Sequence, residues 1–273
     1  MRPEVMNRPR VIAVLSPVGN WAAIEEAAVA ADAAGLDGIG FWDHYHSLAP
    51  DWAYVCGWSA YGALAARTSH VRLVPMVLNS LHYELGVLAK ESSVLSIVSG
   101  GRFELGIGAG DWPESFAAWG QPFPPAEDRL ARLAETAAAL RRLWRGQAVT
   151  VDGSHVHLEG ALSAPPPPAL PRIVVGAGGS IRAVQSALAY ADEINVYAEP
   201  ELVARTRVAL AAAGRGVGLS VFADWSWDHW PADVQGEIER WSRAGVDRLV
   251  ASIGSREMPR RIEILATVST TGA

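Results

Sequence analysis

Short apolar segments rich in β-branched residues alternate with longer amphipathic segments along most of the chain. The short segments have the length of buried strands, and the longer ones repeat apolar residues every three or four positions, as helices do. The predicted strands are residues 10–15, 36–41, 71–78, 102–107, 172–175, 193–197, 217–222 and 247–252, and the predicted helices are residues 21–34, 52–67, 84–98, 125–144, 181–190, 200–213, 231–244 and 259–268. Eight strands that alternate with helices over about 250 residues predict an α/β fold of the (β/α)₈ (TIM) barrel type, because an open doubly wound sheet has fewer strands.

The alternation breaks once, at about residues 146–171. Residues 148–158 read as two short extended segments around Asp152-Gly153, a pair that favours a tight turn, and they predict a surface β-hairpin. The prolines of residues 163–171 exclude a helix there. We therefore expect a single domain over residues 1–273, with the hairpin and the proline-rich connector as its one insertion.

Composition limits the partners that we expect. Half of the residues are hydrophobic and the formal net charge is −6. The single lysine and the arginines are scattered, so we expect neither nucleic acid nor a membrane surface as a partner. Cys56 is the only cysteine, and the first ten residues lack the apolar core of a signal peptide. No apolar run approaches the roughly 20 residues that span a bilayer, and the expected compartment is the cytoplasm.

The loop after the second predicted strand carries the strongest candidate for chemistry. In a (β/α)₈ barrel, ligands and catalytic residues lie at the C-terminal ends of the strands. Asp43 and His44 occupy that place, where a histidine can exchange a proton near pH 7 and an adjacent carboxylate can orient or charge it. The alternative is a loop histidine bonded to backbone. His46 adds a second imidazole, but without further ligands at suitable spacing we expect no metal site.

Three glycines in the sequence LGIGAG mark the end of the fourth predicted strand. Gly106, Gly108 and Gly110 remove side chains where the strand runs into its loop, so a flat or phosphorylated ligand can approach the backbone closely. The dinucleotide-binding motif G-x-G-x-x-G is excluded, because Asp111 stands where its third glycine belongs.

A second glycine-rich turn, GAGGS at residues 176–180, follows the fifth predicted strand and opens a helix. Backbone N–H groups at such a place bind anions, and phosphate is the natural ligand. The alternative is a tight turn that needs glycine only for its backbone. Three glycines in four residues exceed what a turn requires, so we predict a phosphate site.

Taken together, these motifs resemble the bacterial luciferase-like family. The resemblance covers roughly residues 10–250, and it is nearest to the deazaflavin (F420) branch of that family. The motifs that carry it, in order, are FWDHYH, AARTSHVRL, VLNS, LAKESSVLSIVSGGRFELGIGAG, PESFAAWG, RLARLAETAAALRRLW, PRIVVGAGG and YADEINVY.

The resemblance implies a cofactor, F420 or alternatively FMN, whose flat ring lies in the mouth of the barrel. In the family, a bulge with a non-proline cis peptide on the third strand supports this ring, and it corresponds to Met76-Val77 here. Asn79 would then bond the edge of the ring or of its ribityl chain. The family's phosphate site corresponds to Ala177, Gly178 and Gly179, in agreement with the independent reading of the GAGGS turn.

The resemblance also implies roles for three residues and an assembly. His44 corresponds to the histidine that serves as acid, base or ring contact, with Asp43 beside it. Asp111 stands where the family's sugar-phosphate dehydrogenases carry a glutamate, and it is the shorter acid. The chain is short for the family and its lid segments are small, which implies an open pocket or one completed by a second subunit, so we expect a homodimer.

Three functions fit these features. The first is an F420-dependent oxidoreductase that transfers a hydride to or from a small organic substrate. The second is an FMNH2-dependent monooxygenase that uses O2. The third is a barrel that binds a flavin without catalysis, and the completeness of the motifs argues against it.

Overall fold

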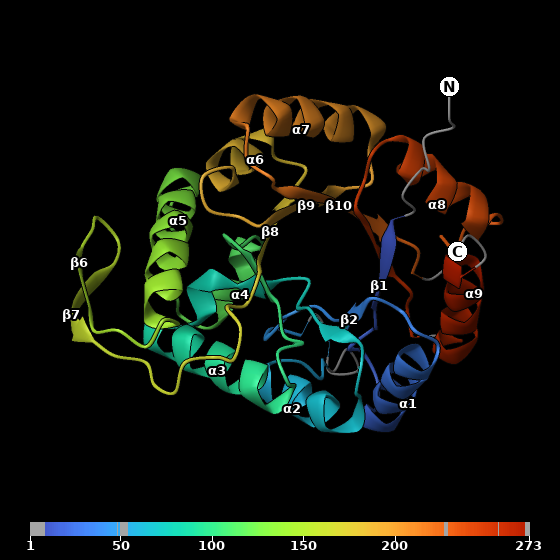
Figure 1. Cartoon of the computed structure of the whole chain (residues 1–273), viewed down its shortest axis with the longest axis horizontal. Helices are drawn as coiled ribbons and strands as arrows, with labels where there is room; N and C mark the ends of the chain where they lie inside the picture. Colours follow the sequence, from blue (N-terminus) through green and yellow to red (C-terminus); the bar gives the residue numbers. More distant parts are fainter. Residues whose placement is uncertain (1–8, 48, 50–53, 227–228, 256, 271–273) are drawn as a thin grey trace.

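The chain folds into a closed parallel barrel surrounded by helices (Figure 1). The computed structural model describes residues 9–47, 49, 54–226, 229–255 and 257–270. The strands of the sheet are β1 (Arg10–Val14), β2 (Gly38–Gly40), β3 (Arg72–Leu73), β4 (Leu78–Asn79), β5 (Leu105–Gly108), β8 (Ile173–Gly178), β9 (Glu193–Tyr197), β10 (Gly218–Asp224) and β11 (Arg248–Ser252). Their order is β3-β2-β1-β11-β10-β9-β8-β5-β4. Because β3 and β4 are two halves of one interrupted strand, the sheet closes on itself and the predicted (β/α)₈ barrel is confirmed.

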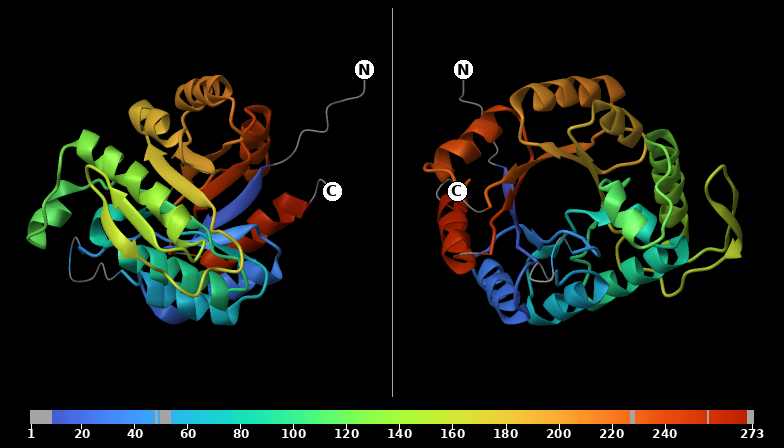
Figure 2. Two further views of the ribbon diagram at one scale, coloured as in Figure 1. Left: turned by 60° about the vertical axis from the view of Figure 1, so that its left-hand side comes forward. Right: turned by 180° about the vertical axis from the view of Figure 1, so that it is seen from behind.

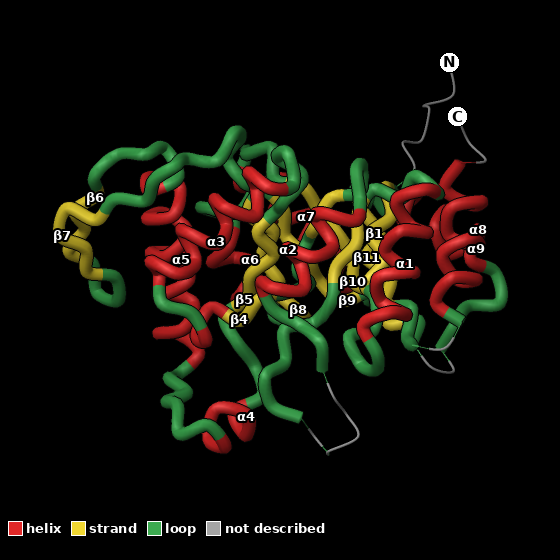
Figure 3. Tube along the Cα trace, turned by 90° about the horizontal axis from the view of Figure 1, so that it is seen from below, coloured by secondary structure: helices red, strands yellow, loops and turns green. Residues whose placement is uncertain are grey.

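Most of the helices form a ring outside the barrel (Figure 2). The helices are α1 (Trp21–Ala33), α2 (Trp58–Arg67), α3 (Leu85–Val98), α4 (Pro113–Ala118), α5 (Ala126–Leu143), α6 (Ile181–Ala187), α7 (Pro200–Ala213), α8 (Val234–Arg243) and α9 (Met258–Thr270), with the 3₁₀ helix η1 (Ser80–His82). The sequence did not predict η1 or α4, and α4 projects beyond one end of the barrel (Figure 3). The helix predicted from residue 52 begins only at Trp58, because Gly57 before it has a φ of 86°; residues 52 and 53 lie outside the described part of the chain.

The predicted hairpin is confirmed as strands β6 (Val149–Asp152) and β7 (His157–Ala161), which pair antiparallel beside the barrel (Figure 1). Its turn is fixed by the carboxylate of Glu135, which accepts backbone N–H groups from Ser154, His155 and Val156 at 2.9–3.1 Å. The Glu135 carboxylate therefore attaches the hairpin to α5, and the two strands are held to each other by their own backbone hydrogen bonds.

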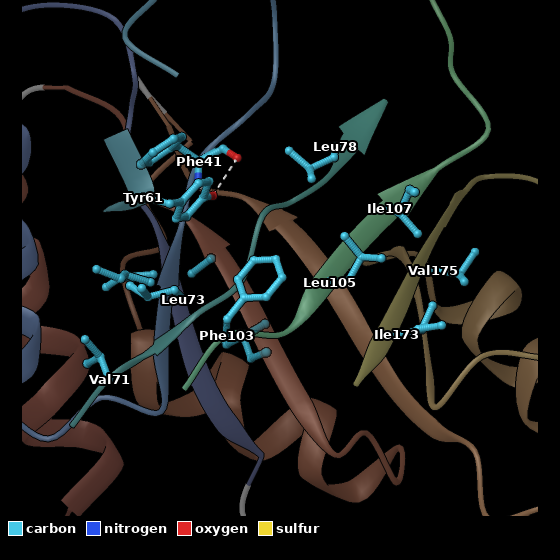
Figure 4. Packing of buried hydrophobic residues seen from close by; sticks show 14 of the residues in the cluster. Phe41, Tyr61, Val71, Leu73, Leu78, Phe103, Leu105, Ile107, Ile173 and Val175 are labelled. Carbon is cyan, nitrogen blue, oxygen red and sulfur yellow. Dashed lines mark hydrogen bonds between the residues drawn. The ribbon is translucent and has the colours of Figure 1, made fainter. Parts of the chain in front are cut away.

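On β1, β8 and β11, alternate residues belong to two separate apolar clusters. On β1, Val11 and Ala13 pack outward against the helices, whereas Ile12 and Val14 point into the barrel. The outer cluster is the larger, and Figure 4 shows part of it around Tyr61, whose hydroxyl oxygen accepts the backbone N–H of Phe41 at 3.0 Å. The inner cluster is small and fills only the middle of the barrel. The two ends of the barrel interior are therefore left to other side chains.

A buried ion network closes the end of the barrel where the strands begin. Arg248 is fully buried, and its guanidinium contacts Glu193 at 2.9–3.1 Å, Glu104 at 2.6 Å and Asp37 at 3.2 Å. Arg72 adds a second cation at 3.2 Å from Glu104. Burial alone would lower the pKa of the Arg248 guanidinium, but the carboxylates of Glu193 and Glu104 outweigh that effect and raise it.

The third barrel strand is interrupted, whereas the sequence predicted one continuous strand over residues 71–78. Pro75 cannot donate a ladder hydrogen bond, and the Met76-Val77 peptide is cis, as the family resemblance implied. The chain bulges here toward its neighbours. A side chain at Gly106 would place its Cβ 1.7 Å from the Pro75 carbonyl oxygen, and one at Gly40 would lie 2.0 Å from that of Val74. Glycine on both flanking strands therefore makes room for the bulge.

The ion network gives a test of stability. We expect Arg248→Met to lower the free energy of unfolding by about 3–5 kcal/mol, because it leaves the carboxylates of Glu193 and Glu104 buried without their central cation. Arg260→Met is the matched control, since Arg260 is 71% exposed and pairs with Glu257 on the surface; its cost should stay below about 1 kcal/mol. Denaturant unfolding measures both. Equal losses for the two variants would contradict the assigned role of Arg248.

Candidate functional site

A pocket of about 490 Å³ opens at the end of the barrel where the strands finish. The ends of β2, β4, β5, β8 and β9 form its floor, and α4 and the start of α5 form part of its wall. Ten of the residues predicted for catalysis or cofactor binding lie in this one lining, namely Asp43, His44, Met76, Val77, Asn79, Gly108, Asp111, Ala177, Gly178 and Gly179. The structure thus brings together four predicted loops that are far apart in the sequence.

Close contacts within the protein explain why glycine stands at several positions of these strands. Gly106 does not line the pocket, and the Pro75 carbonyl occupies the space that a side chain at this position would need. The prediction that a ligand approaches the backbone at Gly106 is therefore wrong. At Gly108 and Gly176, an added Cβ would lie 3.0 Å from a methyl group of Val77. Two strands therefore carry glycine so that Val77 can enter the floor of the pocket.

Asp43 is buried at the end of β2 and holds two neighbouring segments together. Its carboxylate accepts the Tyr83 hydroxyl at 2.9–3.0 Å and the backbone N–H of Asn79 at 3.3 Å. Burial raises the pKa of the Asp43 carboxyl to about 6, although both hydrogen bonds act to lower it. The carboxylate thus bonds Tyr83 and Asn79 and makes no hydrogen bond to the His44 ring, which corrects the pairing expected from their adjacency.

His44 is half-buried, with its ring beside those of Tyr54 and Trp112 at 5.4 and 5.6 Å. Burial lowers the pKa of His44 below its usual 6.5, whereas the negative charge of Asp111 acts to raise it. The ring is therefore neutral at pH 7 and able to accept a proton. Asp111, from the loop after β5, takes the place that the sequence gave to Asp43 as the charged neighbour of this histidine.

Two functional candidates, His82 and Tyr83, were missed because they belong to a segment with no predicted element. Tyr83 follows η1 and bonds Asp43, and its hydroxyl also lies 2.7 Å from that of Tyr45. His82, on η1, stacks on Phe116 of α4 with ring centroids 4.6 Å apart. Burial lowers the pKa of His82, and its bond to Gln121 opposes that shift. The position of His82 and Tyr83 just after a barrel strand is the sequence signal that could have identified them.

The glycine-rich end of β8 and one arginine form a further part of the wall. The strand predicted over residues 172–175 extends to Gly178, so Gly176, Ala177 and Gly178 belong to β8 and not to a turn after it. Gly178 has a φ of 54°, a left-handed conformation that suits glycine, and the Ser180 hydroxyl caps α6 by accepting the Ala183 N–H at 3.2 Å. Arg129 is the only lysine or arginine in the described lining. Its guanidinium lies over Phe123 at 4.0 Å and donates to the Pro124 carbonyl at 2.6 Å, while its buried Nε has no hydrogen-bond partner. Within the described ranges, no three His, Cys, Asp or Glu side chains are placed to hold a metal ion.

Comparison with known proteins gives a family match over most of the chain. A family model described as luciferase-like monooxygenase matches residues 5–265. The F420-dependent glucose-6-phosphate dehydrogenase of Gordonia bronchialis is 31% identical over 161 residues, which cover 57% of this chain and 47% of that protein. Its namesake from Beutenbergia cavernae is 36% identical over 133 residues, which cover 46% of this chain and 38% of that one. The chain thus spans about half the length of the curated relatives it matches, or less.

Solved structures extend the likeness to the whole barrel. An F420-dependent secondary alcohol dehydrogenase in complex with an F420-acetone adduct superposes with a TM-score of 0.83 at 17% identity, covering 96% of this chain and 98% of that one. The F420-dependent tetrahydromethanopterin reductase of Methanopyrus kandleri gives a TM-score of 0.79 at 17% identity, with coverage of 95% and 97%. At this level of identity the likeness establishes the shared fold. No helix in the described part of the chain is long and apolar enough to cross a membrane.

The raised pKa of Asp43 predicts how stability depends on pH. Its carboxyl pKa is about 6 in the folded protein against 3.8 for an unperturbed aspartate, so the folded state binds the extra proton between these values. Its contribution therefore makes folding less favourable as pH rises from about 4 to about 6. Asp43→Asn removes this titration. The free energy of unfolding of the variant, relative to that of the wild type, should therefore increase by up to about 3 kcal/mol as pH rises from 4 to 7.

Urea unfolding at a series of pH values measures this difference. Asp152→Asn, on the exposed hairpin, is the control and should follow the pH dependence of the wild type. If the curves of Asp43→Asn and the wild type remain parallel across this range, the raised pKa is wrong.

Proposed function

The chain belongs to the luciferase-like monooxygenase family, and from that premise we propose that it is an oxidoreductase that binds F420 in the barrel mouth and exchanges a hydride with a small organic substrate. One observation carries the proposal: a single pocket is lined by the interrupted third strand, the glycine-rich end of β8 and His44. The curated relatives are F420-dependent dehydrogenases, which favours F420 over FMN as the cofactor.

The pocket offers suitable groups for each part of such a cofactor. The turn at Ala177, Gly178 and Gly179 would hold a phosphate through backbone N–H groups, because it brings no acidic side chain of its own. Arg129 supports an anion in the same pocket, since its guanidinium lines the wall and its buried Nε lacks a partner. Met76, Val77, Asn79 and Gly108 would then face the ring.

The side chains account for the proton that accompanies the hydride. When bound, F420 would supply the acceptor for a hydride that leaves the carbinol carbon of an alcohol. The neutral His44 ring would take up the hydroxyl proton as the C–H and O–H bonds break and the C=O bond forms. In the opposite direction the protonated ring returns that proton. Asp111 stabilises the protonated ring by its charge, and Asp43 is a second group in the pocket that titrates near neutral pH.

Titration of the apoprotein with reduced F420 and with FMNH2 tests the cofactor. We expect F420 to bind more tightly, and Gly178→Asp to weaken its binding at least about tenfold by adding a side chain and a like charge at the phosphate turn. Gly214→Asp is the matched control, because Gly214 has a similar φ of 63° at the end of α7, outside the lining of the pocket. Tighter FMNH2 binding would favour the monooxygenase alternative, and equal F420 affinity in both variants would rule out the turn.

His44 gives a prediction for turnover. Replacement by alanine should lower kcat by ~10²–10⁴, as expected for a lost general acid or base, with cofactor affinity within a few fold of the wild type. His44→Asn should be nearly as slow, because asparagine keeps a hydrogen bond but cannot carry the proton. For alcohol oxidation, kcat/KM of the wild type should rise with pH through a pKa below 6.5 and then level off, since the neutral ring is the active form.

Asp111→Asn should move this rise to lower pH, because it removes the charge that raises the pKa of His44. Steady-state rates between pH 5 and pH 9 provide the profile. An active His44→Asn variant with the wild-type pH profile would exclude His44 as the proton carrier.

We also propose that the protein is a cytoplasmic homodimer. The free, half-buried thiol of Cys56 suits a reducing compartment. The outer face of α3 exposes Val87, Val94, Ile97 and Val98, an apolar stripe that a second copy could cover. Sedimentation equilibrium measures the state of assembly.

A further inference from the structure

Trp112 stands where the local rules of the chain favour other residues. Its backbone lies in the left-handed region at φ 55° and ψ 69°, and among the described residues only Glu257 shares a positive φ without being glycine. Such a conformation favours glycine, asparagine or aspartate. Trp112 is also the N-cap of α4, a position that prefers a short polar side chain, and it makes no side-chain capping bond. Neither the turn nor the helix therefore explains a tryptophan here.

The indole is instead directed at the functional site. It lines the pocket, and its ring meets that of His44 edge to face, with centroids 5.6 Å apart and planes at 81°. The ring of His46, on the same loop as His44, lies 5.4 Å from the indole. Strained backbone positions gather at functional sites, where surrounding structure maintains them. The bulky side chain at this strained position thus supplies a wall beside the proposed proton carrier.

We propose that Trp112 determines substrate specificity and selects substrates that carry a flat apolar ring beside the reacting group. Four further aromatic side chains line the same pocket, namely Trp42, Phe116, Tyr197 and Phe222. A ring that rests on the indole therefore remains among apolar surfaces. Aromatic surfaces of this kind prefer flat partners over chains of equal size. The inference deepens the proposed function and rests on it, since it concerns the substrate of that same pocket.

Two alcohols of equal carbon number, benzyl alcohol and n-heptanol, test the selectivity. Calorimetric dissociation constants are measured with apoprotein and with protein saturated with F420, and the readout is the ratio of the heptanol constant to the benzyl alcohol constant. In both forms of the wild type, benzyl alcohol should bind the more tightly. Trp112→Ala should lower the ratio about fivefold, and Trp112→Phe should retain most of it because a ring remains.

Two more variants separate this role from a structural one. Trp112→Gly removes the indole but accepts the left-handed backbone without penalty, so it should lose the selectivity while melting at or above the temperature of Trp112→Ala. Trp119→Ala is the matched control, because Trp119 caps the other end of α4, is 60% exposed and lies outside the pocket lining; its ratio should equal that of the wild type.

A wild-type protein that shows no preference for benzyl alcohol, or binds neither alcohol, would overturn the proposal, as would an unchanged ratio in Trp112→Ala. Failure of F420 to bind would contradict the proposed function alone, because the ratio can still be read in the apoprotein.

Discussion

The buried guanidinium of Arg248 is the constraint on which the arrangement of the barrel depends. It joins carboxylates from three other places around the sheet, Asp37 before β2, Glu104 before β5 and Glu193 on β9. A buried charge of this kind is tolerated only while its partners remain in place. The network therefore fixes the relative positions of strands that share no hydrogen-bond ladder. It also fills one end of the barrel with charged side chains, whose displacement by a ligand would leave buried charges without partners.

The interior of the barrel is divided into three layers along its axis. The charged layer closes the end where the strands begin, and the small inner cluster around Ile12, Val174 and Val250 fills the middle. The remaining end is open, and the pocket forms there. Val77, in the bulge at Met76-Val77, forms part of the floor of this pocket. A Cβ at Gly108 or Gly176 would crowd Val77, so glycine at both positions is required by the protein itself. Their small size thus serves the ligand only indirectly, through the shape of that floor.

The regular part of the structure follows from local patterns, whereas the contacts that join distant segments do not. The eight barrel strands and the hairpin could be predicted because alternation and apolar periodicity report on neighbouring residues. The resemblance located the cis peptide at Met76-Val77, which no local preference would have suggested. The partners of Arg248 were beyond reach, because they lie 55, 144 and 211 residues away. For the same reason the sequence placed His44 and Asp43 at the site but paired them with each other, while the fold gives Asp43 to Tyr83 and Asp111 to His44.

The central claim is that this open end of the barrel is a deazaflavin site for hydride exchange. A crystal structure of the protein soaked with oxidised F420 tests it most directly, since the position of the ring and phosphate needs no knowledge of the substrate. The account predicts the ring in the pocket on Val77, within reach of His44, with its phosphate against the turn at Ala177, Gly178 and Gly179. Density for the ring outside this pocket, or a pocket that remains empty at saturating F420, would contradict it.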